Sequence, residues 1–252
     1  MRVAVGYFPS WWISAPQPNQ IDFKNLTHLA YAFTGAGASV NDTMAKRVVT
    51  AAHNAGRKAI LSIGGASEAG LARWIAQSVA NRDVLVASLV QRVSEYGFDG
   101  VDVDVEPIGT SYESGYESFV RALRAALPAS KSVSIAVGGW NEKLMAKLHS
   151  QVEWIGLMSY DLHDTAKVGS EHTPLYGAYS ADSFVKKYIT AGVPREKLCI
   201  GIAHYTHKWL NGKYVGQISY RESLQVQSNG VVLSPVRYAI HHREQTDLRR
   251  RC

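Results

Sequence analysis

The chain has 252 residues, of which 46% are hydrophobic and 19% are charged. This is the length of one barrel-type α/β domain or two small domains, with enough apolar residues for a sizeable core. Part of the net charge of +6 lies in the closing LRRRC. No basic–aromatic stripe indicates nucleic-acid binding, and no apolar run has the length of a membrane span. We therefore expect neither a nucleic-acid nor a membrane partner.

Short runs typical of strands alternate with longer amphipathic runs. The predicted strands are residues 2–8, 27–33, 58–64, 98–106, 132–138, 152–160 and 197–205. The predicted helices run from Asn41 or Asp42 to Gly56, then over 67–80, 83–96, 117–127 and 181–192. Strand–helix alternation predicts a parallel sheet that is covered by helices.

Seven such strands favour the α/β class with a (β/α)8 TIM-type barrel over a doubly wound sheet. No glycine-rich phosphate loop follows any strand, which argues against nucleotide binding. The eighth strand is missing or atypical, because only residues 230–234 and 236–240 offer candidates. We expect a barrel domain over residues 1–215 and an atypical, partly disordered tail over residues 216–252.

The stretch FDGVDVDVEP, residues 98–107, places acids at alternate positions of a predicted strand. Asp102, Asp104 and Glu106 share one face, and the intervening valines share the other. Glu106 comes last, at the rim where barrel active sites lie. Like charges at this spacing raise each other's proton affinity. A shared proton on the two aspartates and another on Glu106 would leave Glu106 able to act as a general acid.

Two other interpretations of these acids remain open. A calcium loop would use Asp102, Asp104, Glu106 and Glu113, but Pro107 stands where such a loop needs glycine. A solvated acidic edge strand would not need an apolar opposite face. A catalytic strand is the interpretation that we favour.

The pattern D-x-x-D-x-D-x-E resembles the signature of glycoside hydrolase family 18, the chitinases and endo-β-N-acetylglucosaminidases. Five further pieces resemble family motifs in the same order: GYFPSWW (6–12), YAF (31–33), SIGG (62–65), MSYD (158–161) and GIAHYTHKW (201–209). The resemblance covers residues 1 to 215. Beyond this point the resemblance ends. The family has a tryptophan on its eighth strand, but this chain has no tryptophan after Trp209. His207 stands near a position where the family usually has arginine.

The resemblance implies a retaining mechanism in which the substrate's own 2-acetamido group is the nucleophile. Glu106 would protonate the leaving oxygen, and Asp104 would hold the acetamido N–H. Asp102 would exchange a proton with Asp104, and Tyr160 would bind the acetamido carbonyl. Asp99 is out of phase with the other acids, so we expect it to be structural.

Other residues are expected to bind the sugar. By resemblance and by the stacking of sugar faces on rings, they are Tyr7, Phe33, Gly65, Trp140, Met158, Asp161 and Tyr205. Trp11, Trp12 and Trp209 are further aromatic candidates. His204 and His207 lack metal-ligand spacing with the nearby acids and Cys199, so we expect no metal or other cofactor.

The predicted function is hydrolysis of β-1,4 linkages in chitin or in N-acetylglucosamine oligosaccharides by a monomer. An endo-β-N-acetylglucosaminidase that acts on N-glycans, or a non-catalytic or weakly active sugar-binding relative, remains the alternative. The family resemblance implies an extracellular protein, while the start MRVAVGYFPS shows no signal peptide and favours a cytoplasmic or mature chain.

Overall fold

The computed structural model describes residues 3–11, 17–36, 42–226 and 230–234. Two compact units divide the chain. Unit 1 comprises residues 1–137 and 143–156, and unit 2 comprises residues 138–142 and 157–252.

Seven strands follow one another in chain order across one sheet. They are β1 (Val5–Pro9), β2 (His28–Thr34), β3 (Lys58–Gly64), β4 (Gly100–Asp104), β5 (Ser132–Val137), β6 (Trp154–Leu157) and β7 (Leu198–Ile200). Strands β1 to β5 pair in parallel with their neighbours. The predicted α/β fold of TIM type, with seven recognisable strands, is confirmed.

Helices connect most of these strands. They are α1 (Asp42–Asn54), α2 (Leu71–Gln77), α3 (Val79–Tyr96), α4 (Glu113–Ala126), α5 (Glu142–Leu148) and α6 (Ala181–Thr190), with short 3-10 turns at Pro18–Gln20, Ala66–Glu68, Thr110–Tyr112, His149–Gln151 and Arg195–Lys197. Gly97 ends α3 in the left-handed conformation, with φ of 78°, as its position predicts. The seven-residue α5 was not predicted. No helix in the described part of the chain is long and apolar enough to cross a membrane.

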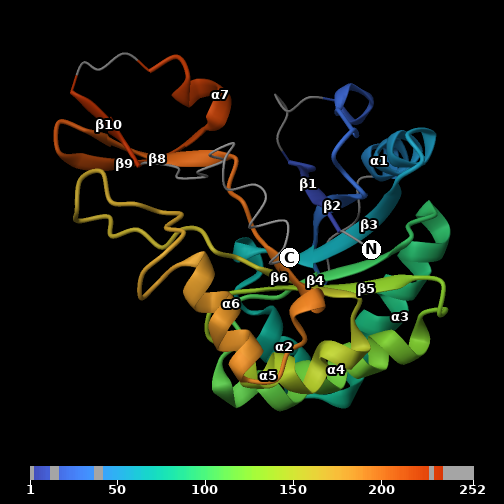
Figure 1. The fold of residues 1–252 in the computed structure, drawn as a ribbon. Helices are drawn as coiled ribbons and strands as arrows, with labels where there is room; N and C mark the ends of the chain where they lie inside the picture. Colours follow the sequence, from blue (N-terminus) through green and yellow to red (C-terminus); the bar gives the residue numbers. More distant parts are fainter. Residues whose placement is uncertain (1–2, 12–16, 37–41, 227–229, 235–252) are drawn as a thin grey trace. The chain divides into compact units, whose positions relative to one another are not determined.

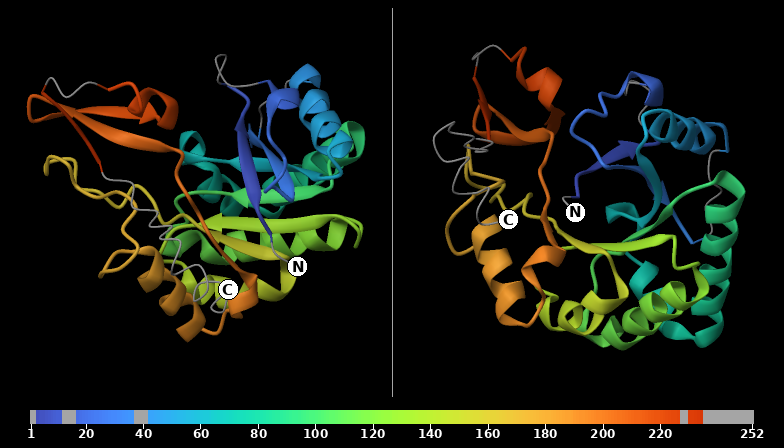
Figure 2. Two further views of the ribbon diagram at one scale, coloured as in Figure 1. Left: turned by 45° about the horizontal axis from the view of Figure 1, so that its top comes forward. Right: turned by 45° about the vertical axis from the view of Figure 1, so that its right-hand side comes forward.

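The core of unit 1 lies between the strands and helices α1, α3 and α4, which cover their outer side (Figures 1 and 2). Val101 and Val103 of β4 are fully buried, and strand geometry directs them away from the face that carries Asp102. Helix α4 buries Tyr116 and Phe119 completely. Each large apolar side chain buried in this way contributes about 1.5–3 kcal/mol to stability.

Unit 2 contains a second, antiparallel sheet in the order β10-β8-β9 (Figure 1). Its strands are β8 (Tyr205–Leu210), β9 (Lys213–Ser219) and β10 (Val231–Leu233). The short helix α7 (Tyr220–Ser223) lies between β9 and β10 in the sequence. The predicted strand 197–205 is therefore wrong at its end, because β7 stops at Ile200. Asn211 and Gly212 have φ of 49° and 79° and form the two-residue turn that folds β9 back on β8.

The antiparallel sheet also shows that one of the two candidates for an eighth barrel strand, residues 230–234, belongs elsewhere. Val231–Leu233 pairs with β8, so these residues do not close a barrel. The other candidate, 236–240, lies outside the described residues, as does most of the predicted disordered tail. The division predicted at residue 215 falls inside β9, and the extent of the two parts stays a prediction.

Asp99 joins α1 to β3 in unit 1. Its Oδ2 accepts a hydrogen bond from the backbone N–H of Ala59 at 2.9 Å and lies 2.8 Å from Nε2 of His53. Its own N–H donates to the carbonyl of Ala59. These contacts support the predicted structural role of Asp99.

We predict that Asp99→Ala lowers the free energy of unfolding by about 1–3 kcal/mol, because the Ala59 N–H loses its acceptor. Chemical denaturation measures this change. Asp83→Ala is the matched control, since its pair with Arg82 is exposed and such pairs contribute about 0–1 kcal/mol. Equal losses in the two variants would contradict the role of Asp99.

Candidate active site

Three hydroxyl groups surround the buried carboxylate of Asp102. Ser62 on β3 and Tyr7 on β1 donate to Oδ2, both at 2.8 Å, and Ser134 on β5 donates to Oδ1 at 2.6 Å. The register explains this convergence, because Ser62 and Ser134 are the direct partners of Asp102 in the sheet. Burial raises the pKa of Asp102, and the hydrogen bonds from Ser134, Ser62 and Tyr7 oppose that rise.

Asp104 follows on the same face of β4 and is only 5% exposed. Its Oδ1 is buried and makes no hydrogen bond within the described residues. Burial, then the charges of Asp102 and Glu106, raise the pKa of Asp104 to about 9. Asp104 therefore holds a proton at neutral pH.

Glu106 lies two residues beyond the end of β4 and is half-buried. The prediction that the strand includes Glu106 is wrong. The neighbouring strand β3 ends at Gly64, where φ of 104° at Gly64 and 79° at Gly65 turn the chain away. The last contact between the two segments is the N–H of Gly65, which donates to the carbonyl of Asp104 at 2.7 Å.

Gly65, predicted to bind substrate, also makes room for Phe33. A Cβ at Gly65 would lie 2.6 Å from two atoms of the Phe33 ring, and a positive φ further disfavours any side chain there. Gly65 therefore connects the acid strand with the aromatic residues of β1 and β2.

Aromatic rings gather at the carboxyl ends of β1 and β2. Trp11 stacks on Phe33 with ring centroids 5.6 Å apart, and Tyr7 lies 6.4 Å from Phe33. Tyr7 is 43% and Trp11 63% exposed. The structure thus brings Tyr7, Phe33, Gly65 and the acids together within unit 1, with the further candidate Trp11 beside Phe33. Trp12 lies outside the described residues.

The predicted site residues of unit 2 form a second group around Asp161. Tyr205 donates to Oδ2 of Asp161 at 2.6 Å, and the Tyr160 ring lies 6.2 Å from the Tyr205 ring. Burial opposes ionisation of Asp161, but the nearby His172 ring, the Tyr205 hydroxyl and His207 outweigh it and lower the pKa of Asp161 to about 2. Asp161 is therefore ionised at neutral pH.

The remaining candidates of unit 2 differ in exposure. Trp140 is 60% exposed and meets the ring of Phe184 edge-on, and Met158 is half-buried. Trp209 is fully buried and donates from Nε1 to the carbonyl of Thr165 at 3.1 Å. Trp209 is therefore a core residue, and its position does not suit contact with a sugar.

Sequence reasoning missed the two serines that hold Asp102. A signal was present, because Ser62 and Ser134 stand on buried strands with apolar residues on either side. Polar positions of that kind point to the face that carries the acids. His172 was also missed, since it lies in the long connection after β6, where no periodic pattern marks buried positions.

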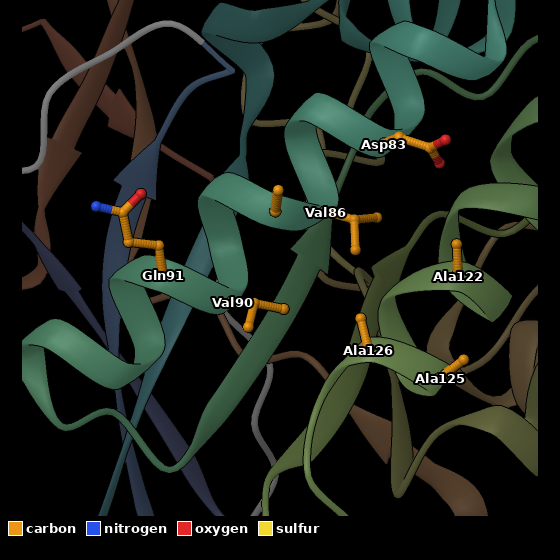
Figure 3. A pocket seen from close by; sticks show the side chains of 8 residues that line it. Asp83, Val86, Val90, Gln91, Ala122, Ala125 and Ala126 are labelled. Atoms are coloured by element: carbon orange, nitrogen blue, oxygen red, sulfur yellow. The ribbon is translucent and has the colours of Figure 1, made fainter.

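A surface hollow in unit 1 is not part of this site. It lies between α3 and α4, has a volume of about 750 Å³, and is lined by Asp83, Val86, Ala87, Val90, Gln91, Ala122, Ala125 and Ala126 (Figure 3). Small apolar side chains dominate the lining. None of the predicted site residues contributes to it.

The family model of glycosyl hydrolases family 18 matches residues 3–246. The chain therefore belongs to glycosyl hydrolases family 18, and the resemblance inferred from its motifs is confirmed.

Individual relatives agree with this assignment. Chitinase 1 of Aphanocladium album is 25% identical over 84% of this chain, which spans 62% of that relative's length. A class V chitinase mutant from Cycas revoluta, solved in complex with (GlcNAc)3, has a TM-score of 0.84 at 20% identity. The match covers 99% of this chain and 92% of the Cycas revoluta chain. That likeness shows the fold. A chitinase-like agglutinin from Robinia pseudoacacia has a TM-score of 0.75 at 25% identity, covering 88% and 79%.

The raised pKa of Asp104 predicts a pH dependence of stability. The folded chain keeps a proton that the unfolded chain releases above the ordinary pKa of 3.8, until the folded pKa of about 9 is reached. The protonated Asp104 therefore contributes most to the free energy of unfolding below pH 3.8, relative to higher pH, and this contribution is lost as the pH rises toward 9. We expect Asp104→Asn to flatten this decline by at most ~1.4 kcal/mol per pH unit.

Urea denaturation across this pH range measures the slope for both proteins. Asp83→Asn, which removes a surface carboxyl, controls for the change in net charge. A slope that Asp104→Asn leaves unchanged would mean that Asp104 is ionised in the folded chain.

Proposed function

We propose that this chain hydrolyses β-1,4 linkages between N-acetylglucosamine units, in chitin or in its oligosaccharides, with retention of configuration. The observation that carries the proposal is the arrangement on β4. A carboxylate held by three hydroxyls, Asp102, is followed on the same face by a buried, protonated Asp104 and then by Glu106. Family membership supplies the reaction class.

Glu106 is the proposed general acid. It donates a proton to the glycosidic oxygen as the bond from that oxygen to the anomeric carbon breaks. The carbonyl oxygen of the substrate's 2-acetamido group attacks the same carbon from the opposite face and forms an oxazolinium ion. Glu106, now a carboxylate, takes a proton from the water that opens this ring. Two displacements at one carbon give retention.

Asp104 is the proposed partner of the acetamido group. Its Oδ1 makes no hydrogen bond within the described residues, so this atom is an acceptor for the acetamido N–H. Positive charge develops on that group as the oxazolinium forms, and a carboxylate beside it is more favourable than a neutral acid. Transfer of the Asp104 proton to Asp102 would provide that carboxylate at the moment when it is needed.

The aromatic residues supply the proposed sugar contacts. Tyr7, Trp11 and Phe33 expose ring surface in unit 1, and the C–H faces of sugars stack on such rings. In unit 2, family resemblance assigns Tyr160 to the acetamido carbonyl. Further sugar contacts are proposed for Trp140, Met158, Asp161 and Tyr205. We propose that a monomer carries the activity.

A sugar-binding role without catalysis is the second candidate. It is favoured by the likeness to a chitinase-like agglutinin and by the seven strands of the described sheet. The presence of Glu106 favours hydrolysis. An endo-β-N-acetylglucosaminidase that acts on N-glycan cores would use the same residues, and comparing chitotriose with an N-glycan core as substrates distinguishes the two.

We predict that Glu106→Gln retains oligosaccharide binding but loses about a hundred- to ten-thousandfold in turnover, because the amide keeps the shape without the acidic proton. A fluorogenic chitobioside measures turnover, and calorimetry measures binding. Glu113→Gln, at the start of α4, is the control. Comparable rates for Glu106→Gln and the parent would defeat the assignment, and absence of turnover in the parent would favour the sugar-binding role.

We also predict that the 2-acetamido group is obligatory. Cello-oligosaccharides and fully deacetylated chitosan should not be cleaved, since neither carries the internal nucleophile. A thiazoline mimic of the oxazolinium ion should inhibit. Proton NMR of the first product formed should show the β-anomer, and an α-anomeric product would rule out substrate assistance.

A further inference from the structure

Asp161, His172 and His207 form a compact group in unit 2, here named the His–Asp cluster. Nε2 of His207 lies 2.8 Å and Nδ1 of His172 lies 3.7 Å from the same atom, Oδ1 of Asp161. One ligand atom from each of the three side chains lies within 4.8 Å of the other two. Three donors of metal-binding type therefore lie close enough together for a single ion to reach all of them after small side-chain movements.

The His172 ring makes this group unusual. His172 is completely buried, and neither of its ring nitrogens makes a hydrogen bond within the described residues. A buried polar group without a partner costs about 1–3 kcal/mol. At 3.7 Å, the separation of Nδ1 from Asp161 is too long for a hydrogen bond. The ring thus lies within ion-pair distance of a carboxylate but makes no hydrogen bond to it.

Surrounding residues orient the other two members of the cluster. The Tyr214 hydroxyl lies 2.8 Å from Nδ1 of His207, and the Tyr205 hydroxyl donates to Oδ2 of Asp161. His163 stacks on His207 with ring centroids 3.6 Å apart. Hydrogen bonds to the far side of ligating histidines and carboxylates are a regular feature of metal sites, because they fix the ring and the tautomer.

We propose that Asp161, His172 and His207 bind a divalent transition-metal ion of the zinc class. Two imidazoles and one carboxylate are a ligand set that zinc uses, with a fourth position for water or another ligand. Tetrahedral bonds of about 2.0–2.1 Å place ligand atoms about 3.3 Å apart. The observed separations of 2.8 and 3.7 Å from Asp161 lie on either side of that value. Asp161 has 42% of its side chain exposed, which leaves a path from solvent to the ion.

Such an ion would join the connection after β6 to the antiparallel sheet. His172 comes from that connection and His207 from β8, while the backbone N–H of Leu162 donates to the carbonyl of His172 at 3.1 Å. The ion would thus hold two segments that are far apart in the sequence. The proposal shares Asp161 with the proposed sugar site, but its test uses metal binding rather than turnover, so either proposal can fail without the other.

Calorimetric titration of the chelator-treated chain with Zn²⁺ tests the proposal, with bound metal counted by mass spectrometry. We expect one Zn²⁺ per chain, a rise in melting temperature with Zn²⁺, and little response to Mg²⁺. His172→Ala should bind at least about a hundredfold more weakly and lose the thermal shift. His204→Ala, an exposed histidine of the same segment, should match the parent.

A milder variant keeps the test decisive if His172→Ala fails to fold. Tyr214→Phe removes only the hydroxyl beside His207 and should weaken Zn²⁺ binding about 10- to 100-fold. Binding by His172→Ala equal to the parent, a stoichiometry well below one, or equal losses in His204→Ala would overturn the proposal. So would unchanged affinity in Tyr214→Phe.

Discussion

The carboxylate of Asp102 has no exposed surface, and the hydroxyls of Tyr7, Ser62 and Ser134 make its burial possible. These residues come from β1, β3 and β5, on both sides of β4. An isolated buried carboxylate would cost several kcal/mol, so the strands must keep their register for the chain to fold around it. The same register places Asp104 one strand repeat further along. The roles proposed for Asp104 and Glu106 therefore depend on the hydrogen bonds that stabilise buried Asp102.

Much of this arrangement follows from local patterns in the sequence. The run GVDVD, with its apolar and acidic faces, predicts a strand of this kind, and the structure places β4 at Gly100–Asp104. Strand–helix alternation predicts the order of the seven strands, because parallel strands need helical crossovers. Gly97 likewise marks the end of α3 through its left-handed φ. These features depend on a few neighbouring residues, which is why they can be predicted.

Features that depend on partners distant in the sequence were harder to predict. The hydroxyls around Asp102 become evident only when the registers of three strands are known. Residues 197–205 look like one strand, yet the chain leaves β7 after Ile200 and enters the antiparallel sheet. The Asn211-Gly212 pair is a local hairpin signal that the parallel pattern obscured. His172 lies in a long connection without periodicity, so its burial beside Asp161 follows from tertiary structure alone.

The lack of a side chain at Gly65 restricts which residues around Phe33 can change during evolution. The N–H of Gly65 closes the pairing with the carbonyl of Asp104, and its missing side chain provides the space that the Phe33 ring fills. A larger residue here would displace the Phe33 ring and strain the backbone whose N–H pairs with Asp104, so this position tolerates little change. Trp11, by contrast, stacks on Phe33 and is largely exposed. Under the proposed function, changes in sugar preference would therefore accumulate more readily at Trp11 than at Gly65.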